Sequence, residues 1–199
     1  MPAVATPKRN QEKLDLYRQH AADYTARREP AIVNIARCQY LAIDGAGIPG
    51  GEEFQACIGA LYGVAFTIKM AQKSSGRDYG VCKLEGLWPE LKVWSLLIRT
   101  PDFITKEHLD TAIMNLIRKR KEGPIESVRL LPLKEGWCVQ TLHVGPYSDE
   151  AGTLEKMRGC ASEAGMDFHG TLHEIYLSDP RRVVPEKLRT ILRQPLRDR

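Results

Sequence analysis

The sequence has no long hydrophobic run and no apolar segment near its N-terminus, and each absence excludes a class of protein. No apolar stretch approaches the roughly 18 residues that a membrane-spanning helix needs. The longest candidate, residues 56–65, is interrupted by Gly59, Tyr62 and Gly63. The first residues also lack the apolar core of a secretory signal peptide. We therefore expect a cytoplasmic protein that makes no contact with a membrane.

Paired cysteine spacings are absent as well. The sequence has five cysteines, an odd number, and no two of them form a C-x-x-C motif. Neither a zinc site nor a disulfide framework is therefore indicated. His143 and His173 lie far apart, with no third ligand at a recognisable spacing. We expect reduced thiols, no metal and no organic cofactor.

What is present is the composition of a globular protein. The 199 residues are 43% hydrophobic and 27% charged, which is enough for a buried core without cross-links. The net charge of +4 comes from the C-terminus, because residues 181–199 contain seven basic and two acidic residues. We interpret this tail as a solvated basic helix that starts near Pro185 and is stopped by Pro195. No motif that reads nucleic acid accompanies it, so we expect no nucleic-acid binding.

Hydrophobic periodicity divides the chain into a loosely ordered N-terminal arm (residues 1–30) and a single domain (residues 31–199). Within the domain, apolar residues spaced three and four apart predict helices, and β-rich runs bounded by turn residues predict strands. The predicted helices are residues 52–70, 105–121 and 149–164. The predicted strands are residues 38–44, 78–88, 91–100, 128–133, 137–144 and 171–177.

The order of these elements contains a weak internal repeat. An apolar strand ends at Gly45–Gly47 before a helix with an acidic start, and a second strand ends at Gly145-Pro146 before another. We predict an α+β fold made of two β-α-β-β repeats, residues 31–125 and 126–199, related by a pseudo-twofold axis. Its curved antiparallel sheet would carry the helices on one side. The groove between the repeats would be the natural ligand site.

Residues 45–50 match the G-x-G-x-x-G pattern of dinucleotide-binding loops. Pro49 has no N–H for a phosphate, and no acidic residue follows at the distance that such a site requires. The pattern therefore favours a tight corner between a strand and a helix.

The segment LHEIYLSDP places an acid within an apolar strand. Alternation puts Glu174 and Tyr176 on the same face, and burying an acid is costly unless it has a partner or a role. Glu174 is either a functional group that binds a cation or activates water, or a structural partner of an arginine in the tail. The aromatic residues Trp88, Trp94 and Tyr147 either belong to the core, which periodicity favours, or form a wall around a ligand.

Several separated motifs, in order, are similar to those of the GyrI-like small-molecule-binding family. They are YLAIDGAGIPGGEEFQACIGALYGVAFTIK, LEGLW, RTPDFIT, EGWCVQTLHVGPYSDEAGTLEKM and HEIYLSDPRRVVPEKLRTILRQP, and they extend over about residues 20–197. The resemblance implies the effector-binding fold of AraC-type and multidrug-responsive regulators, here without a DNA-binding module. It also implies a pocket with an acid on the last main strand, matched by Glu174 and Tyr176, and aromatic walls matched by Trp88, Trp94 and Tyr147.

Stand-alone members that the chain resembles are cyclopropanoid cyclopropyl hydrolases, which open the strained ring of DNA-alkylating compounds by adding water. The chain departs from them at Pro89, where a second aromatic residue is common, and at Leu172, where a histidine is common. The resemblance implies a cofactor-independent hydrolase with Glu174 and Tyr176 as catalytic residues and a flat aromatic or cationic ligand. The alternatives are a protein that sequesters drugs without catalysis and an inhibitor of a partner such as DNA gyrase. The oligomeric state is open, with a monomer slightly favoured.

Overall fold

The computed structural model describes residues 13–90 and 92–199. The helices are α1 (Leu16–Gln19), α2 (Glu52–Ser74), α3 (Lys106–Arg118) and α4 (Glu150–Glu163), with short 3-10 turns η1 (Ala21–Tyr24), η2 (Ile125–Ser127), η3 (Tyr147–Asp149) and η4 (Pro185–Lys187). The strands are β1 (Ala31–Ile35), β2 (Cys38–Ala46), β3 (Glu85–Glu90), β4 (Val93–Thr100), β5 (Arg129–Leu133), β6 (Gly136–Val144), β7 (Met166–Phe168), β8 (Leu172–Tyr176) and β9 (Arg189–Asp198).

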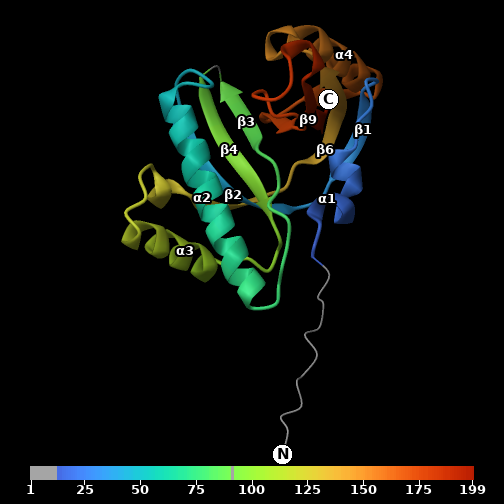
Figure 1. The fold of residues 1–199 in the computed structure, drawn as a ribbon. Helices are drawn as coiled ribbons and strands as arrows, with labels where there is room; N and C mark the ends of the chain where they lie inside the picture. The colour runs from blue at the N-terminus through green and yellow to red at the C-terminus, as the bar shows by residue number, and fades with distance from the viewer. Residues whose placement is uncertain (1–12, 91) are drawn as a thin grey trace, which may run out of the picture.

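The strands form one curled antiparallel sheet with the order β1-β6-β9-β8-β3-β4-β2-β5, and β7 pairs with β9 outside this path. The two halves of the sheet have the same strand order: β5-β2-β4-β3 in one corresponds to β1-β6-β9-β8 in the other. Helix α2 follows β2 in the chain, and helix α4 likewise follows β6. Figure 1 shows the result as two lobes, with α2 and α3 on one and α4 on the other. The α+β class and the antiparallel sheet with helices that we predicted are confirmed.

The two halves of the sheet do not follow the predicted division of the chain at residue 125. Strand β1, which lies in the first predicted repeat, pairs with β6 in the second lobe. Strand β5, which lies in the second predicted repeat, pairs with β2 in the first lobe. Each lobe therefore takes its outermost strand from the other part of the chain.

The main helices cover the same face of the sheet. In the first lobe, the apolar stripe of α2, with Leu61, Val64 and Ile68, is buried against β2 and β4. In the second lobe, Met157 and Ala161 of α4 pack on β6 and β9. Among the described residues, α2 is the one helix whose length and hydropathy would suit a membrane span. About a third of this apolar segment, including Leu61, Val64 and Ile68, is buried in the core.

The glycine corner before α2 is a packing feature. A Cβ on Gly45 would lie 2.1 Å from the ring of Trp94, which faces it across the β2–β4 pair. The loop then turns through Gly47 and Gly50, whose φ angles of 115° and 82° favour glycine. This agrees with the prediction of a strand-to-helix corner for residues 45–50.

Two predictions at the ends of the chain are corrected. Within residues 13–30, expected to belong to a loosely ordered arm, residues 16–24 contain α1 and η1, and Leu16 is buried in the core. The earlier part of the predicted arm lies outside the described residues. The predicted basic C-terminal helix is instead the long strand β9, preceded by the short turn η4. Pairing with both β6 and β8 makes β9 a central strand. Consecutive residues of β9 are therefore buried, because both faces of the strand are covered.

Candidate functional site

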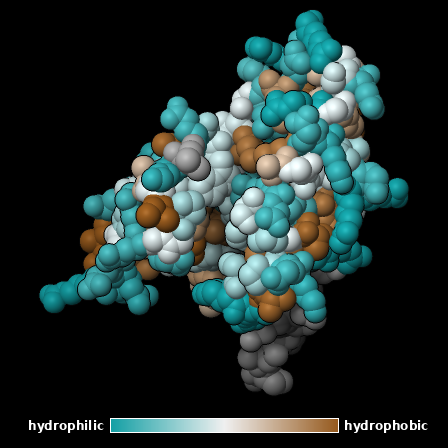
Figure 2. Space-filling view, turned by 90° about the horizontal axis from the view of Figure 1, so that it is seen from above, coloured by the Kyte–Doolittle hydropathy of each residue, from teal (hydrophilic) through white to brown (hydrophobic). Residues whose placement is uncertain are grey.

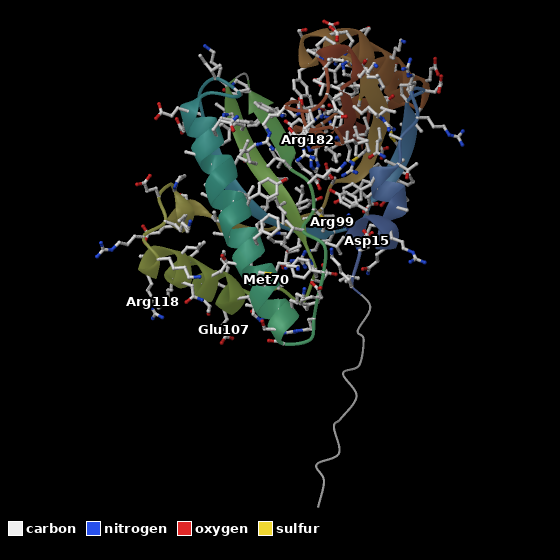
Figure 3. The ribbon with its side chains drawn as sticks, in the orientation of Figure 1. Asp15, Met70, Arg99, Glu107, Arg118 and Arg182 are labelled. Atoms are coloured by element: carbon white, nitrogen blue, oxygen red, sulfur yellow. The ribbon has the colours of Figure 1, made fainter. Side chains whose placement is uncertain are left out.

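The candidate site lies where the two lobes meet, on the central strands β3 and β8. Helix α2 packs on β2 and β4, and helix α4 packs on β1, β6 and β7, so the middle of the sheet lies between them. Seen from above, the surface is indented between the lobes (Figure 2). Gly86 of β3 and Glu174 of β8 are direct neighbours there. Exposed Arg182, in the loop after β8, lies near the upper end of this junction (Figure 3).

Glu174, Tyr176 and Trp88 form the core of the site. The Nε1–H of Trp88 donates a hydrogen bond of 3.1 Å to the hydroxyl oxygen of Tyr176, and Tyr176 in turn hydrogen-bonds the Glu174 carboxyl group. Glu174 is 8% exposed. Burial raises its pKa, although the hydrogen bonds from its neighbours oppose the change. The predicted association of Glu174 with Tyr176 and Trp88 is thus present in the structure.

Glu150 is a second buried carboxyl group in the same site, and we did not single it out from the sequence. It is the first residue of α4, is 7% exposed, and is in hydrogen-bonding contact with Glu174. Burial, followed by the charge of Glu174, raises the pKa of Glu150 to about 9. Its Oε1 atom is buried and accepts no hydrogen bond from the described residues. The pair therefore holds a proton at neutral pH, since two adjacent buried carboxylates cannot both ionise readily.

Gly86 makes room for these side chains. A Cβ at this position would lie 2.8 Å from the Tyr176 hydroxyl oxygen and 3.0 Å from Trp88 Nε1. The absence of a side chain on β3 therefore allows Tyr176 and Trp88 to meet above the backbone.

The predicted aromatic residues lie at different depths. Tyr147 is 40% exposed and packs edge-on against Tyr176, with ring centres 5.9 Å apart, so it lies at the rim. Trp88 is partly buried and stacks with Phe54 of α2 at 6.3 Å. Trp94 is 1% exposed and lies beneath Phe54, whose ring it meets edge-on at 5.0 Å. The prediction that Trp94 contacts a ligand directly is therefore corrected, because Phe54 and Gly45 enclose it in the core.

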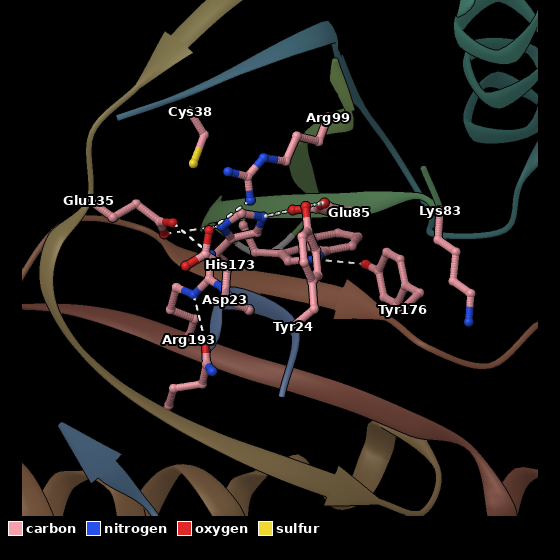
Figure 4. Close-up of polar contacts among 12 residues, drawn as sticks. Asp23, Tyr24, Cys38, Lys83, Glu85, Arg99, Glu135, His173, Tyr176 and Arg193 are labelled. Atoms are coloured by element: carbon pink, nitrogen blue, oxygen red, sulfur yellow. Dashed lines mark hydrogen bonds and ion pairs between the residues drawn. The ribbon is translucent and has the colours of Figure 1, made fainter. Parts of the chain in front are cut away.

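The opposite face of the same strands holds a buried network of charges (Figure 4). His173 lies 3.0 Å from a carboxylate oxygen of Glu85 and 3.0 Å from one of Glu135. Arg193 of β9 donates to Glu135 at 2.9 Å and to Gln140 at 2.8 Å. This arginine of the tail thus pairs away from the site, and no described basic side chain forms an ion pair with Glu174. The structural reading of Glu174 as a partner of the tail is wrong for the described residues.

The N-terminal segment completes this network. Asp23 pairs with Arg99 at 2.8 Å and accepts a hydrogen bond from Arg193 on its backbone oxygen. The hydroxyl of Tyr24 donates to Glu85 at 2.9 Å. The network attaches residues 23–24 to the back of strands β3 and β4, opposite the site.

Burial alone would lower the pKa of His173, but Glu135 and Glu85 outweigh it and raise the pKa to about 9. For Glu135, the charges of His173 and Arg193 outweigh burial and lower the pKa to about 2. His143, the other histidine considered from the sequence, contacts Thr153 at 2.9 Å and the backbone oxygen of Pro146 at 3.1 Å. The two histidines lie in different polar environments.

Two surface cavities lie away from the carboxyl pair. One, of about 570 Å³, lies between α4 and the end of β9, and the other, of about 250 Å³, is lined by residues that include Tyr17, Tyr24 and Lys83. Neither includes Glu150, Glu174, Trp88 or Tyr176. The chemistry of the carboxyl pair, rather than the size of a cavity, therefore identifies the site.

A model of the GyrI-like small molecule binding domain matches residues 28–197. The chain belongs to the GyrI-like family. No curated protein matches the chain at a significant level. Small-molecule binding is thus the property that the family model describes for this GyrI-like protein.

Solved structures agree with the assignment. A hydrolase from Listeria innocua is 34% identical, with a TM-score of 0.87, over 93% of this chain and all of that one. An uncharacterized conserved protein from the same organism is 35% identical, with the same TM-score and coverage. The C-terminal domain of EcmrR is 12% identical over 85% of this chain and 98% of that one, and its TM-score of 0.53 shows a shared fold alone.

Proposed function

We propose that this protein binds flat aromatic or cationic small molecules over β3 and β8, and adds water to the strained ring of cyclopropanoid DNA-alkylating compounds. It would do so in the cytoplasm, without a metal or organic cofactor. The observation that carries the proposal is the buried Glu174 carboxyl group beside the Tyr176 hydroxyl, with Glu150 as a second carboxyl. The Listeria relative described as a hydrolase supports the same direction.

The carboxyl pair supplies both forms that such a reaction needs. One carboxyl group is ionised and accepts a proton from water, while the other keeps its proton. The oxygen of that water bonds to the cyclopropane methylene carbon as the strained carbon–carbon bond breaks. The bonding electrons enter the conjugated ring, and its carbonyl oxygen becomes a phenol by taking up a proton. The net change is the addition of one water molecule.

Tyr176 and the aromatic residues position the substrate in this scheme. The hydroxyl of Tyr147, or that of Tyr176 once it turns from Glu174 to the ligand, would hydrogen-bond the carbonyl oxygen on which negative charge develops. Trp88 and Tyr147 would form the walls of an aromatic cage, with Phe54 rather than Trp94 as the residue next to Trp88. Because ring opening restores aromaticity, general-base assistance of about 10²–10⁴-fold is sufficient.

The test is to incubate the protein with a cyclopropanoid alkylator and follow the product by mass spectrometry. Enzymatic hydrolysis gives a product heavier by one water molecule, at a rate proportional to protein concentration. The Glu174→Gln variant should lose this activity, whereas Glu155→Gln, which changes an exposed acid of α4, should keep it. A compound that is bound but recovered unchanged would leave a sequestering protein as the function.

A further inference from the structure

Glu150 and Glu174 approach each other from different elements, and the described residues place no cation between them. Glu150 comes from the start of α4 and Glu174 from the middle of β8. The titratable groups that face the pair are Tyr176 of β8 and Tyr147 of η3. From β3, the neutral indole of Trp88 also faces it.

The positive charge of His173 acts on Glu174, but it is on the other face of the sheet. Its two ring nitrogens lie 3.0 Å from Glu85 and Glu135, so its charge is already balanced. The Glu150–Glu174 pair is therefore neutralised only in part, by the proton that it holds. The buried Oε1 atom of Glu150 accepts no hydrogen bond from the described residues, so the pair also contains an unsatisfied hydrogen-bond acceptor.

A ligand with a positive charge can replace that proton. We propose that the Glu150–Glu174 pair releases its proton when a cationic aromatic ligand binds, and keeps it when a neutral aromatic ligand of the same shape binds. This inference rests on the proposed site. In the exchange, an O–H bond of the pair breaks, the proton enters solvent, and the ligand becomes the counter-ion of the two carboxylates. The site thereby accepts both a neutral substrate and a cation.

Proton release makes cation binding depend on pH in a definite direction. A nearby positive charge lowers the pKa of a carboxyl group, so the complex binds fewer protons than the free protein. By linkage, the affinity for the cation rises by up to about tenfold per pH unit between roughly pH 7 and pH 9. A neutral ligand does not favour the deprotonated pair in this way, so we expect its affinity to stay constant or to fall as pH rises.

Isothermal titration calorimetry with two isosteric probes tests the proposal. N-methylquinolinium carries a permanent charge, and 1-methylnaphthalene has the same shape without it. Titration in two buffers of different ionisation enthalpy measures the protons released per bound ligand. We expect close to one proton for the cation at about pH 8 and none for the neutral probe.

The matched variants separate the pair from the rest of the site. Glu150→Gln leaves a single carboxyl group whose pKa only burial raises, so it should still bind the cation but release fewer protons and depend less on pH. Glu174→Gln should reduce proton release in the same way, while Glu155→Gln on the same helix should behave as the wild type. Cation binding with no proton release in the wild type would overturn the exchange and leave the proposed site intact. If neither probe binds at any pH, the proposed site and the exchange both fail.

Discussion

The indole N–H of Trp88 donates its hydrogen bond to the hydroxyl oxygen of Tyr176. Because that oxygen already accepts a hydrogen bond from Trp88, the O–H of Tyr176 is free to donate to the Glu174 carboxyl group. One polar contact between neighbouring strands thus orients a tyrosine toward the acid. Burial and the charge of Glu174 hold the pKa of Tyr176 well above its ordinary value, so this hydroxyl acts as a donor throughout the physiological range.

Adding a methyl group at Gly86 should damage the site more than the fold. In Gly86→Ala, the new Cβ would displace the Tyr176 hydroxyl and the Trp88 indole. We expect a loss of ligand affinity or turnover of at least about tenfold, equal to about 1.4 kcal/mol. Gly63→Ala is the control, because nothing lies within 4 Å of its Cβ in α2. That change should leave activity unaltered and stabilise the protein by about 1 kcal/mol.

Removing the charge of Glu174 should separate function from stability. Glu174→Gln should lower turnover or cation affinity about tenfold or more, and its melting temperature should stay level or rise. The reason is that the carboxyl group is buried beside Glu150 without an ion-pair partner among the described residues. Activity assays and thermal melts on the same preparation measure both effects. A large fall in melting temperature with unchanged binding would contradict the functional role.

Trp94 should behave as a core residue. In Gly45→Ala, the new Cβ overlaps the Trp94 ring, and overpacking of this kind costs about 1–3 kcal/mol. Urea unfolding should show the loss, while the affinity of the folded protein for an aromatic probe stays within about twofold of the wild type. A selective loss of affinity at unchanged stability would place Trp94 in direct contact with the ligand.

The network behind the sheet should make stability fall at alkaline pH. His173 keeps its proton in the folded protein up to a pKa of about 9 but loses it near 6.5 when unfolded. Between these values the folded state binds more protons, so its stability decreases as pH rises, by up to about 1.4 kcal/mol per unit. The measurement is urea unfolding from about pH 6 to pH 9.5. It is made in the Glu150→Gln variant, because the raised pKa of Glu150 also makes stability decrease as pH rises.

In that background His169→Gln, which changes an exposed histidine, should retain the slope. His173→Gln should lose it and be less stable at neutral pH. Stability that is constant or rises over this range would show that His173 is not charged in the folded protein.

The elements that could be predicted from the sequence are those whose apolar residues follow a single helical or strand pattern. Helix α2 and strands β2 and β6 were predicted to within a few residues because each buries a single stripe or a continuous apolar run. Strand β9 was missed since its buried residues include Arg193. A buried arginine can be recognised only with its partners Glu135 and Gln140, which come from a distant part of the sequence.

The same reason explains which site residues were predicted. Glu174 stands out as an acid within an apolar strand. Glu150 does not, because an acid at the first turn of a helix is the ordinary expectation, and only the fold brings it against β8. Phe54 has the spacing of a core residue on α2 and also lies beside Trp88. The acidic start of the predicted helix 149–164 was the one available signal for Glu150.

The pairing of β3 with β8 sets when the site can form during folding. Gly86 and Glu174 are direct neighbours in the sheet but lie 88 residues apart along the chain. Closing so long a segment has a large entropic cost, and contacts of this kind form slowly. Apart from the outermost strands β1 and β5, the strand pairs within each lobe join residues that are closer in sequence, so we expect these parts of each lobe to organise before the site does. The environment of Trp88, at the seam between the lobes, would then report the last step of folding.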